Sequence, residues 1–186
     1  MTYDTTNAIN FLNGVGTDAN GRTVEDYKKF GMDRWEECHD HIQWAFPSHI
    51  ASDFNPNAPV VDMHELIYGL DHNGKHNVME LYVKYLRSIG IQRTWGGILS
   101  LESLENFWLT PHNHNFRRLT RVLNFLSYYN PDYAVELVHL LCNIVETMES
   151  NKPVLTVGMV NYWGSPNCID AKTVVYWVKA ALGELK

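Results

Sequence analysis

Two short segments of the chain gather the histidine, amide, cationic and aromatic side chains that ligand binding or catalysis requires. The first is His39-Asp40-His41-Ile42-Gln43-Trp44-Ala45-Phe46-Pro47. Polar groups beside large aromatic rings are typical of a half-buried polar site, and His41, Gln43 and Trp44 are its candidate ligand-binding residues. The alternative is that His41 and Trp44 belong to the core, with their polar atoms bonded to loop backbone.

The second segment is His112-Asn113-His114-Asn115-Phe116-Arg117-Arg118-Leu119-Thr120-Arg121. On a helix, His114, Arg118 and Arg121 stand at i, i+4 and i+7 and fall within an arc of about 60°. With Asn115 they form a cationic face whose N–H donors suit a carboxylate or a phosphate, and the helix N-terminus adds to its positive field. The alternative is a solvated basic face or a set of structural salt bridges.

Each segment places polar groups beside a hydrophobic stripe, and such groups are costly to bury without partners. We therefore expect the two segments to pack next to each other and to form one shared site. His41 and Trp44 should then lie within about 15 Å of at least one of His114, Arg118 and Arg121.

Other kinds of chemistry have weaker support. The two His-x-His triplets lack a third and fourth ligand at suitable spacing, so no metal site and no cofactor is expected. Cys38 falls in the apolar stripe of its predicted helix, which favours packing over a nucleophilic role. The sequence contains none of the common phosphate-loop, dinucleotide-binding, hydrolase-elbow or zincin motifs.

The elements that must position these residues are helices. Apolar spacing predicts helices from Asp33 to Phe46, from His76 to Arg87 and from about His114 to Tyr129, because the periodicity is 3.6 residues. Further helices are predicted to start after Asp62, to open at Asn130-Pro131, and to carry Val174, Trp177, Val178 and Ala181 near the end of the chain. The predicted fold is all-α, a compact multi-helix single domain over residues 1–186, with at most a short extended segment near 154–160.

Composition and charge limit the cellular location and the binding partners that we expect for the protein. The formal net charge is -6 and the sequence pI is about 5.8, which argues against nucleic acid as a partner. No segment approaches 18 consecutive apolar residues, so no membrane span is expected. Three cysteines without a C-x-x-C pair favour a reducing compartment, and we expect a cytoplasmic protein.

At these two segments the chain resembles the conserved region of the opioid growth factor receptor family, including its prokaryotic and viral members. Cys38 to Pro47 is similar to the family's H-D-x-I-Q-W-x-F-P pattern, and His114 to Leu123 to its H-N-x-x-R-x-T-R-x-L helix. The loops Asn20 to Thr23 and Phe54 to Pro59 are also similar, and the resemblance is strongest over residues 11–141. His41 stands where an aromatic residue is common, and Arg117 where an aliphatic one is. The resemblance implies an all-helical domain and carries over no catalytic mechanism.

Three functions are consistent with these observations. We favour a non-enzymatic binding domain with a His/Arg/Trp site for an anionic small molecule or a protein segment. The second hypothesis is an enzyme acting on a nucleotide or another phosphorylated small molecule, with His41 or His114 as general acid or base. The third is a purely structural or protein-interaction module.

Overall fold

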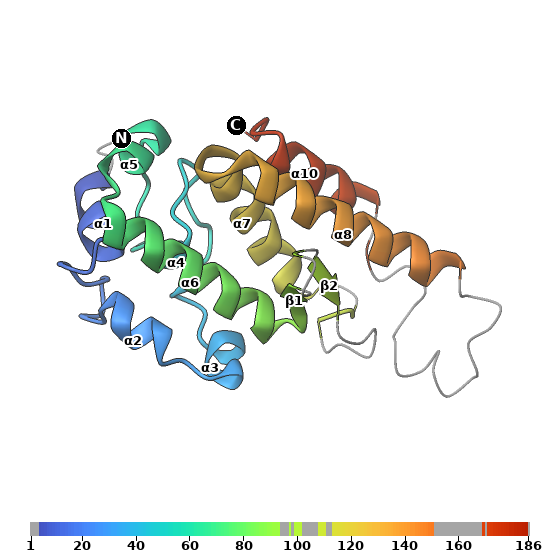
Figure 1. Ribbon diagram of the computed structural model, residues 1–186, viewed down its shortest axis with the longest axis horizontal. Coiled ribbons are helices and arrows are strands. Elements are labelled where there is room, and N and C mark those ends of the chain that lie inside the picture. Colours follow the sequence, from blue (N-terminus) through green and yellow to red (C-terminus); the bar gives the residue numbers. More distant parts are fainter. Residues whose placement is uncertain are drawn as a thin grey trace. The chain divides into compact units, whose positions relative to one another are not determined.

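Helices dominate the computed structural model, which describes residues 4–93, 97, 99–101, 108–110, 113–150, 169 and 171–185 (Figure 1). Helix makes up 61% of the described residues, and the one sheet among them has two strands. The all-α prediction is therefore confirmed. The chain divides into two compact units, residues 1–88 and residues 89–185, and each is described here by itself.

The first unit is built around its longest helix, α6. Its helices are α1 (Thr5–Leu12), α2 (Val24–Lys28), α3 (Met32–Glu37), α4 (Ile42–Ala45), α5 (Met63–Gly69) and α6 (His72–Ser88). Helices α1, α2 and α3 all pack on α6, and α1 also contacts α4 and α5. The side chains of Val78, Leu81 and Tyr85 are buried on α6, as the helical spacing predicted. This helix begins earlier than predicted because the Asp71 carboxylate accepts the Gly74 N–H at 2.7 Å and caps its first turn.

The prediction of one helix from Asp33 to Phe46 is wrong. Helix α3 ends at Glu37 and α4 begins at Ile42, with Cys38 in an extended conformation between them. The carboxylate of Asp40 accepts a hydrogen bond from the Cys38 thiol, and local side-chain bonds of this kind compete with continuation of a helix. Cys38 therefore does not lie in the apolar stripe of a helix.

The second unit packs three helices on one another, α7 (Asn115–Tyr129), α8 (Pro131–Ser150) and α10 (Ala171–Ala181). The predicted helices are confirmed here, with α7 beginning one residue after His114. Its core contains Leu119, Leu123 and Leu126 of α7, Leu137, Leu141 and Ile144 of α8, and Trp177 of α10.

A small hairpin completes the second unit and was not predicted. Strand β1 (Ile91–Arg93) pairs antiparallel with β2 (Leu99–Leu101). The carboxylate of Glu136 on α8 contacts both strands. It pairs with the Arg93 guanidinium of β1 at 2.6 Å and accepts the Leu99 N–H of β2 at 3.1 Å. The extended segment predicted near 154–160 lies outside the described residues. No helix in the described part of the chain is long and apolar enough to cross a membrane.

Candidate functional site

The seven residues predicted to form the site fall into two groups, one in each unit. His41, Gln43 and Trp44 lie in the first unit, and the other four begin α7 in the second: His114, Asn115, Arg118 and Arg121. That the two groups form one shared site stays a prediction.

The cationic face of α7 combines buried and exposed groups. Asn115 is fully buried, Arg118 keeps only 6% of its surface exposed, and Arg121 is half-buried, whereas His114 is exposed just before the helix begins. The guanidinium of Arg118 donates to the Asn115 side-chain oxygen at 3.5 Å. A solvated basic face is thus excluded for Arg118.

Burial also changes the electrostatics of Arg121. Removal from water lowers the pKa of Arg121 to about 10, because burial disfavours the charged form. A guanidinium in such surroundings is stabilised by an opposing negative charge. The face of α7 therefore has the chemistry to hold an anionic group.

Two residues that sequence reasoning missed position the first turn of α7. The Asn113 side-chain oxygen accepts the backbone N–H of Asn115 at 2.9 Å and its side-chain amide at 3.1 Å. From α10, the Trp177 indole N–H donates to the Phe116 carbonyl at 3.0 Å, and the two rings meet edge to face with centroids 5.9 Å apart. These contacts fix the backbone of the first turn of α7, which carries the Asn115 and Arg118 side chains.

The predicted residues of the first unit are all buried. His41 has no exposed surface, and its ring centroid lies 4.6 Å from that of Trp35, 5.8 Å from that of Phe30 and 5.9 Å from that of Tyr27. His39, two residues earlier, is exposed. This aromatic surrounding favours a core position for the His41 ring.

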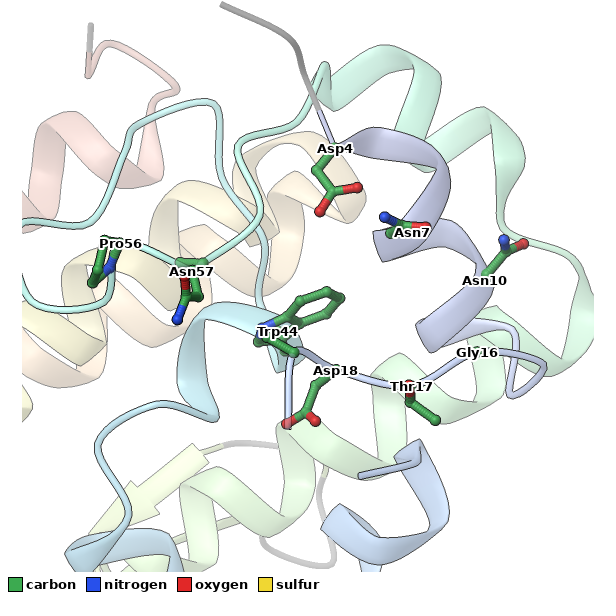
Figure 2. Close-up of a pocket in the computed structure, with 11 residues that line it drawn as sticks. Asp4, Asn7, Asn10, Gly16, Thr17, Asp18, Trp44, Pro56 and Asn57 are labelled. Atoms are coloured by element: carbon green, nitrogen blue, oxygen red, sulfur yellow. The ribbon is translucent and has the colours of Figure 1, made fainter. Parts of the chain in front are cut away.

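Trp44 reaches a pocket of about 710 Å³ (Figure 2). The rest of the lining comes from Asp4, which precedes α1, from Asn7 and Asn10 on α1, and from the 16–19 and 56–58 loops. Figure 2 shows Trp44 between α1 and the loop that carries Pro56 and Asn57. The polar side chains that line this pocket are carboxylates, amides and the Thr17 hydroxyl, and its lining residues include no histidine or arginine. Such a lining suits hydroxyl or ammonium groups better than an anion.

One of the residues that line this pocket, Asp18, forms an ion pair with Arg22. The Asp18 side chain is fully buried and accepts the Arg22 Nε–H at 2.6 Å and the Tyr27 hydroxyl at 2.7 Å. Backbone N–H groups of Asn20 and Arg22 also donate to it, at 2.9 and 2.8 Å. Burial and the bond to Asp18 raise the pKa of Tyr27, so its hydroxyl stays a donor.

The other edge of the Arg22 guanidinium faces the break between α3 and α4. It donates to the Asp40 carboxylate at 2.9 Å and to the Cys38 sulfur at 3.3 Å, and the Cys38 thiol donates to Asp40 at 2.9 Å. We call Asp18, Arg22, Tyr27, Cys38 and Asp40 the Arg22 network. The sequence analysis did not predict this network, although Arg22 lies in the Asn20 to Thr23 loop and Cys38 and Asp40 lie in the Cys38 to Pro47 segment of the family resemblance.

The Arg22 network makes stability depend on pH through Asp40. Burial alone would raise the pKa of Asp40, but the hydrogen bonds from Cys38 and Arg22 outweigh burial and lower it. A carboxyl whose pKa is lower in the folded state stabilises the fold above its unfolded pKa, and that stabilisation is lost as pH falls through the folded pKa. We expect the parent to melt above Asp40→Asn at pH 7, with the difference shrinking as pH falls below about 4 and disappearing only below the folded-state pKa of Asp40.

Thermal melts of both proteins from pH 7 to pH 2 measure this difference. Asp53→Asn is the control, because Asp53 is exposed and lies in the following loop. A difference between parent and Asp40→Asn that stays constant down to pH 2 would contradict the pKa shift.

The fold and these contacts define a helical protein with a buried ionic network in one unit and a buried cationic helix face in the other. Residues 3–173 match the sequence family described as the opioid growth factor receptor (OGFr) conserved region. The chain belongs to this family, as its two motifs indicated. No curated protein and no solved structure matches the chain.

Proposed function

We propose that the protein is a non-enzymatic binding domain whose α7 face binds an anionic group, a phosphate or carboxylate of a small molecule or of a protein segment. The single observation that carries the proposal is the burial of Arg118 beside half-buried Arg121 on one face of α7. Burying a guanidinium is costly in water-free surroundings, and a bound anion offsets that cost with charge-assisted hydrogen bonds.

The geometry around the two arginines supports recognition of an oxyanion. Arg118 lies in the first turn of α7, where the helix dipole is positive, and Arg121 follows one turn later. The side chain of Asn115 donates to Asn113 and accepts from Arg118, so it orients the guanidinium of Arg118 on this face.

A phosphate-cleaving enzyme is the second candidate, favoured by exposed His114 at the start of the same helix. Its Nε2 lies 3.4 Å from the side-chain nitrogen of Asn115, and the side-chain oxygen of that asparagine accepts from Arg118. A histidine there could exchange protons with a bound phosphate ester. Release of phosphate from ATP or p-nitrophenyl phosphate, abolished in His114→Ala, would replace the non-enzymatic proposal with this one.

The binding test uses inorganic phosphate, ATP and acetate as probes, with affinity measured by calorimetry. Arg118→Ala and Arg121→Ala should each weaken phosphate or ATP binding by about ten- to a hundredfold, because a hydrogen bond to a charged group contributes about 1.5–3 kcal/mol. Arg117→Ala is the matched control, since Arg117 lies on the same helix and is exposed. It should bind each probe within about twofold of the parent.

The same variants separate binding from a merely structural role. If the arginines only stabilise the fold, each Ala variant should lose about 1–3 kcal/mol of unfolding free energy, with no probe binding to the parent. Parent-like melting of Arg118→Ala and Arg121→Ala together with unchanged affinity for every probe would contradict the site.

A further inference from the structure

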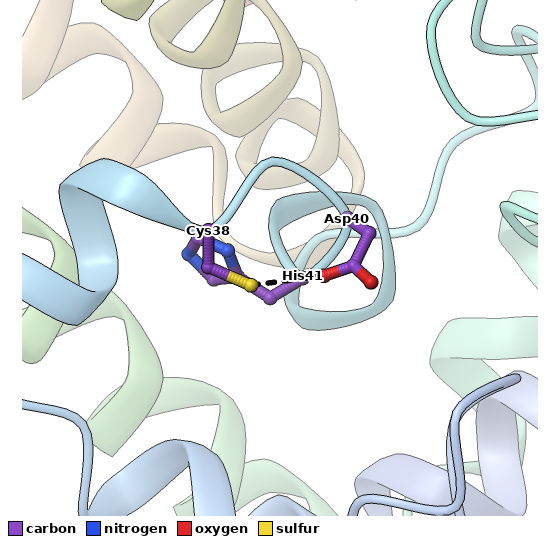
Figure 3. Close-up of side chains that lie close together, drawn as sticks. All are labelled: Cys38, Asp40 and His41. Carbon is purple, nitrogen blue, oxygen red and sulfur yellow. Dashed lines mark hydrogen bonds between the residues drawn. The ribbon is translucent and has the colours of Figure 1, made fainter.

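We propose that Cys38, Asp40 and His41 form a binding site for a divalent transition-metal ion of the Zn²⁺ type. The three residues lie in the break between α3 and α4 in the first unit (Figure 3). This inference is independent of the anion-binding face on α7, and it goes beyond the His-x-His pairs that the sequence analysis considered.

The donor atoms have the right identity and spacing. A thiol sulfur, a carboxylate oxygen and an imidazole nitrogen all lie within 4.8 Å of one another. Zn²⁺ prefers sulfur and nitrogen ligands at about 2.0–2.3 Å in tetrahedral geometry, which places neighbouring donors about 3.5 Å apart. The Cys38 sulfur and the Asp40 oxygen are 2.9 Å apart, so small side-chain rotations bring the set to that spacing.

The local charge also favours a cation. Asp18 and Asp40 carry two negative charges against the single positive charge of Arg22, which leaves the Arg22 network with one excess negative charge. A divalent ion that binds Cys38 displaces the thiol proton to solvent, so the ion adds two positive charges and the thiolate one negative charge. The network with metal is therefore neutral.

Metal binding requires the Arg22 guanidinium to release its hydrogen bonds to Asp40 and Cys38. Arg22 shares Asp40 with the incoming ion, but its Nε–H bond to fully buried Asp18 at 2.6 Å does not involve Asp40. Arg22 can thus keep its buried partner while Asp40 turns to the metal. The second oxygen of Asp40 accepts from the Asn20 amide at 2.6 Å, which orients the carboxylate as outer partners of metal ligands do.

The site has both a closed side and an open side. His41 is fully buried among aromatic rings, which separate this side of the site from solvent. The Asp40 side chain is 39% exposed, so an ion can enter from solvent and a water molecule can serve as fourth ligand. Three protein ligands and one water is a common coordination for Zn²⁺.

Cobalt(II) is the probe for the first experiment, because Co²⁺ bound to thiolate absorbs in the near ultraviolet. Full-length protein, stripped with a chelator and kept reduced, is titrated with CoCl₂ and then with ZnCl₂. We expect a thiolate-to-cobalt absorption band that saturates at one ion per chain and disappears when Zn²⁺ displaces Co²⁺. A parent protein that develops no such band would overturn the proposal.

Three variants assign the band to the site. Cys38→Ser should abolish it, and Asp40→Asn should weaken Co²⁺ binding at least about tenfold. Cys142→Ser is the matched control, because Cys142 is also a half-buried free cysteine but lies on α8, and it should titrate like the parent. A band that survives Cys38→Ser and is lost in Cys142→Ser would place the metal elsewhere and reject the site.

A chemical protection experiment on the unaltered protein tests the site without relying on variants that could misfold. Zn²⁺ should protect Cys38 of the unaltered protein from alkylation by iodoacetamide at least about tenfold, measured by peptide mass spectrometry, and leave Cys142 equally reactive. Equal alkylation of Cys38 with and without saturating Zn²⁺ would count against the proposal even if the variants fold poorly.

Discussion

Asp18→Asn is expected to lower the free energy of unfolding by about 3–5 kcal/mol, because it removes the fully buried carboxylate that accepts from Arg22 and Tyr27 and leaves Arg22 with only the partly exposed Asp40 as its ionic partner. Asp18 is fully buried and receives two side-chain hydrogen bonds, from Arg22 and Tyr27. The asparagine keeps the shape of the side chain but loses the charge. For a chain of this length the melting temperature should fall by about 10 °C.

Thermal and urea unfolding measure the effect, and an exposed ion pair supplies the control. Glu25 pairs with Lys28 at 2.8 Å, but its side chain is 62% exposed and Lys28 also pairs with Glu80. Glu25→Gln should therefore change stability by less than about 1 kcal/mol. Equal losses in Asp18→Asn and Glu25→Gln would show that the Arg22 network contributes no more than a surface salt bridge.

Trp177→Ala is expected to cost a similar amount, about 3–5 kcal/mol, because it empties the space of a fully buried indole. It also removes the hydrogen bond to the Phe116 carbonyl and the edge-to-face contact with the Phe116 ring. Since Phe116 lies between Asn115 and Arg118 in the first turn of α7, this variant should also weaken phosphate binding at the proposed site.

Tyr176→Ala is the control for Trp177, because the neighbouring tyrosine on α10 is 45% exposed. We expect it to change stability by less than about 0.5 kcal/mol and to leave phosphate affinity unchanged. Trp177→Phe separates the two roles, since it keeps an aromatic ring but loses the indole N–H. If Trp177→Ala melts within 2 °C of the parent, about the effect of 1 kcal/mol, the packing of α10 on the start of α7 is wrong.

Local patterns in the sequence were sufficient to predict most of the helices. Period-3.6 spacing marked α6, α7 and α8, and the Asp62 carboxylate caps α5 by accepting the Glu65 N–H at 2.9 Å, as the motif predicted. These signals lie within a few residues of each other along the chain, so no knowledge of the tertiary fold is needed to interpret them. The family signature at Cys38 to Pro47 was equally local.

The same periodicity failed where distant residues intervene. The spacing of Trp35, Cys38 and Ile42 fits a helix, yet Arg22 and Asn20 bind Asp40 from a loop about 20 residues earlier and the helix breaks. A pattern of apolar residues contains no information about which loop will supply a guanidinium. Helix propensity is also a small energy per residue, so a charged hydrogen-bond network overrides it.

By itself, then, the sequence determined the helical class, the family, and the cationic face that begins at His114. Only the tertiary structure decided that Arg118 is buried, that His41 lies in an aromatic core, and that Cys38, Asp40 and His41 meet. The physical reason is that helix periodicity and capping act between near neighbours in the chain. Burial and ionic pairing depend instead on contacts between residues far apart in the sequence, as between Arg22 and Asp40 or Phe116 and Trp177.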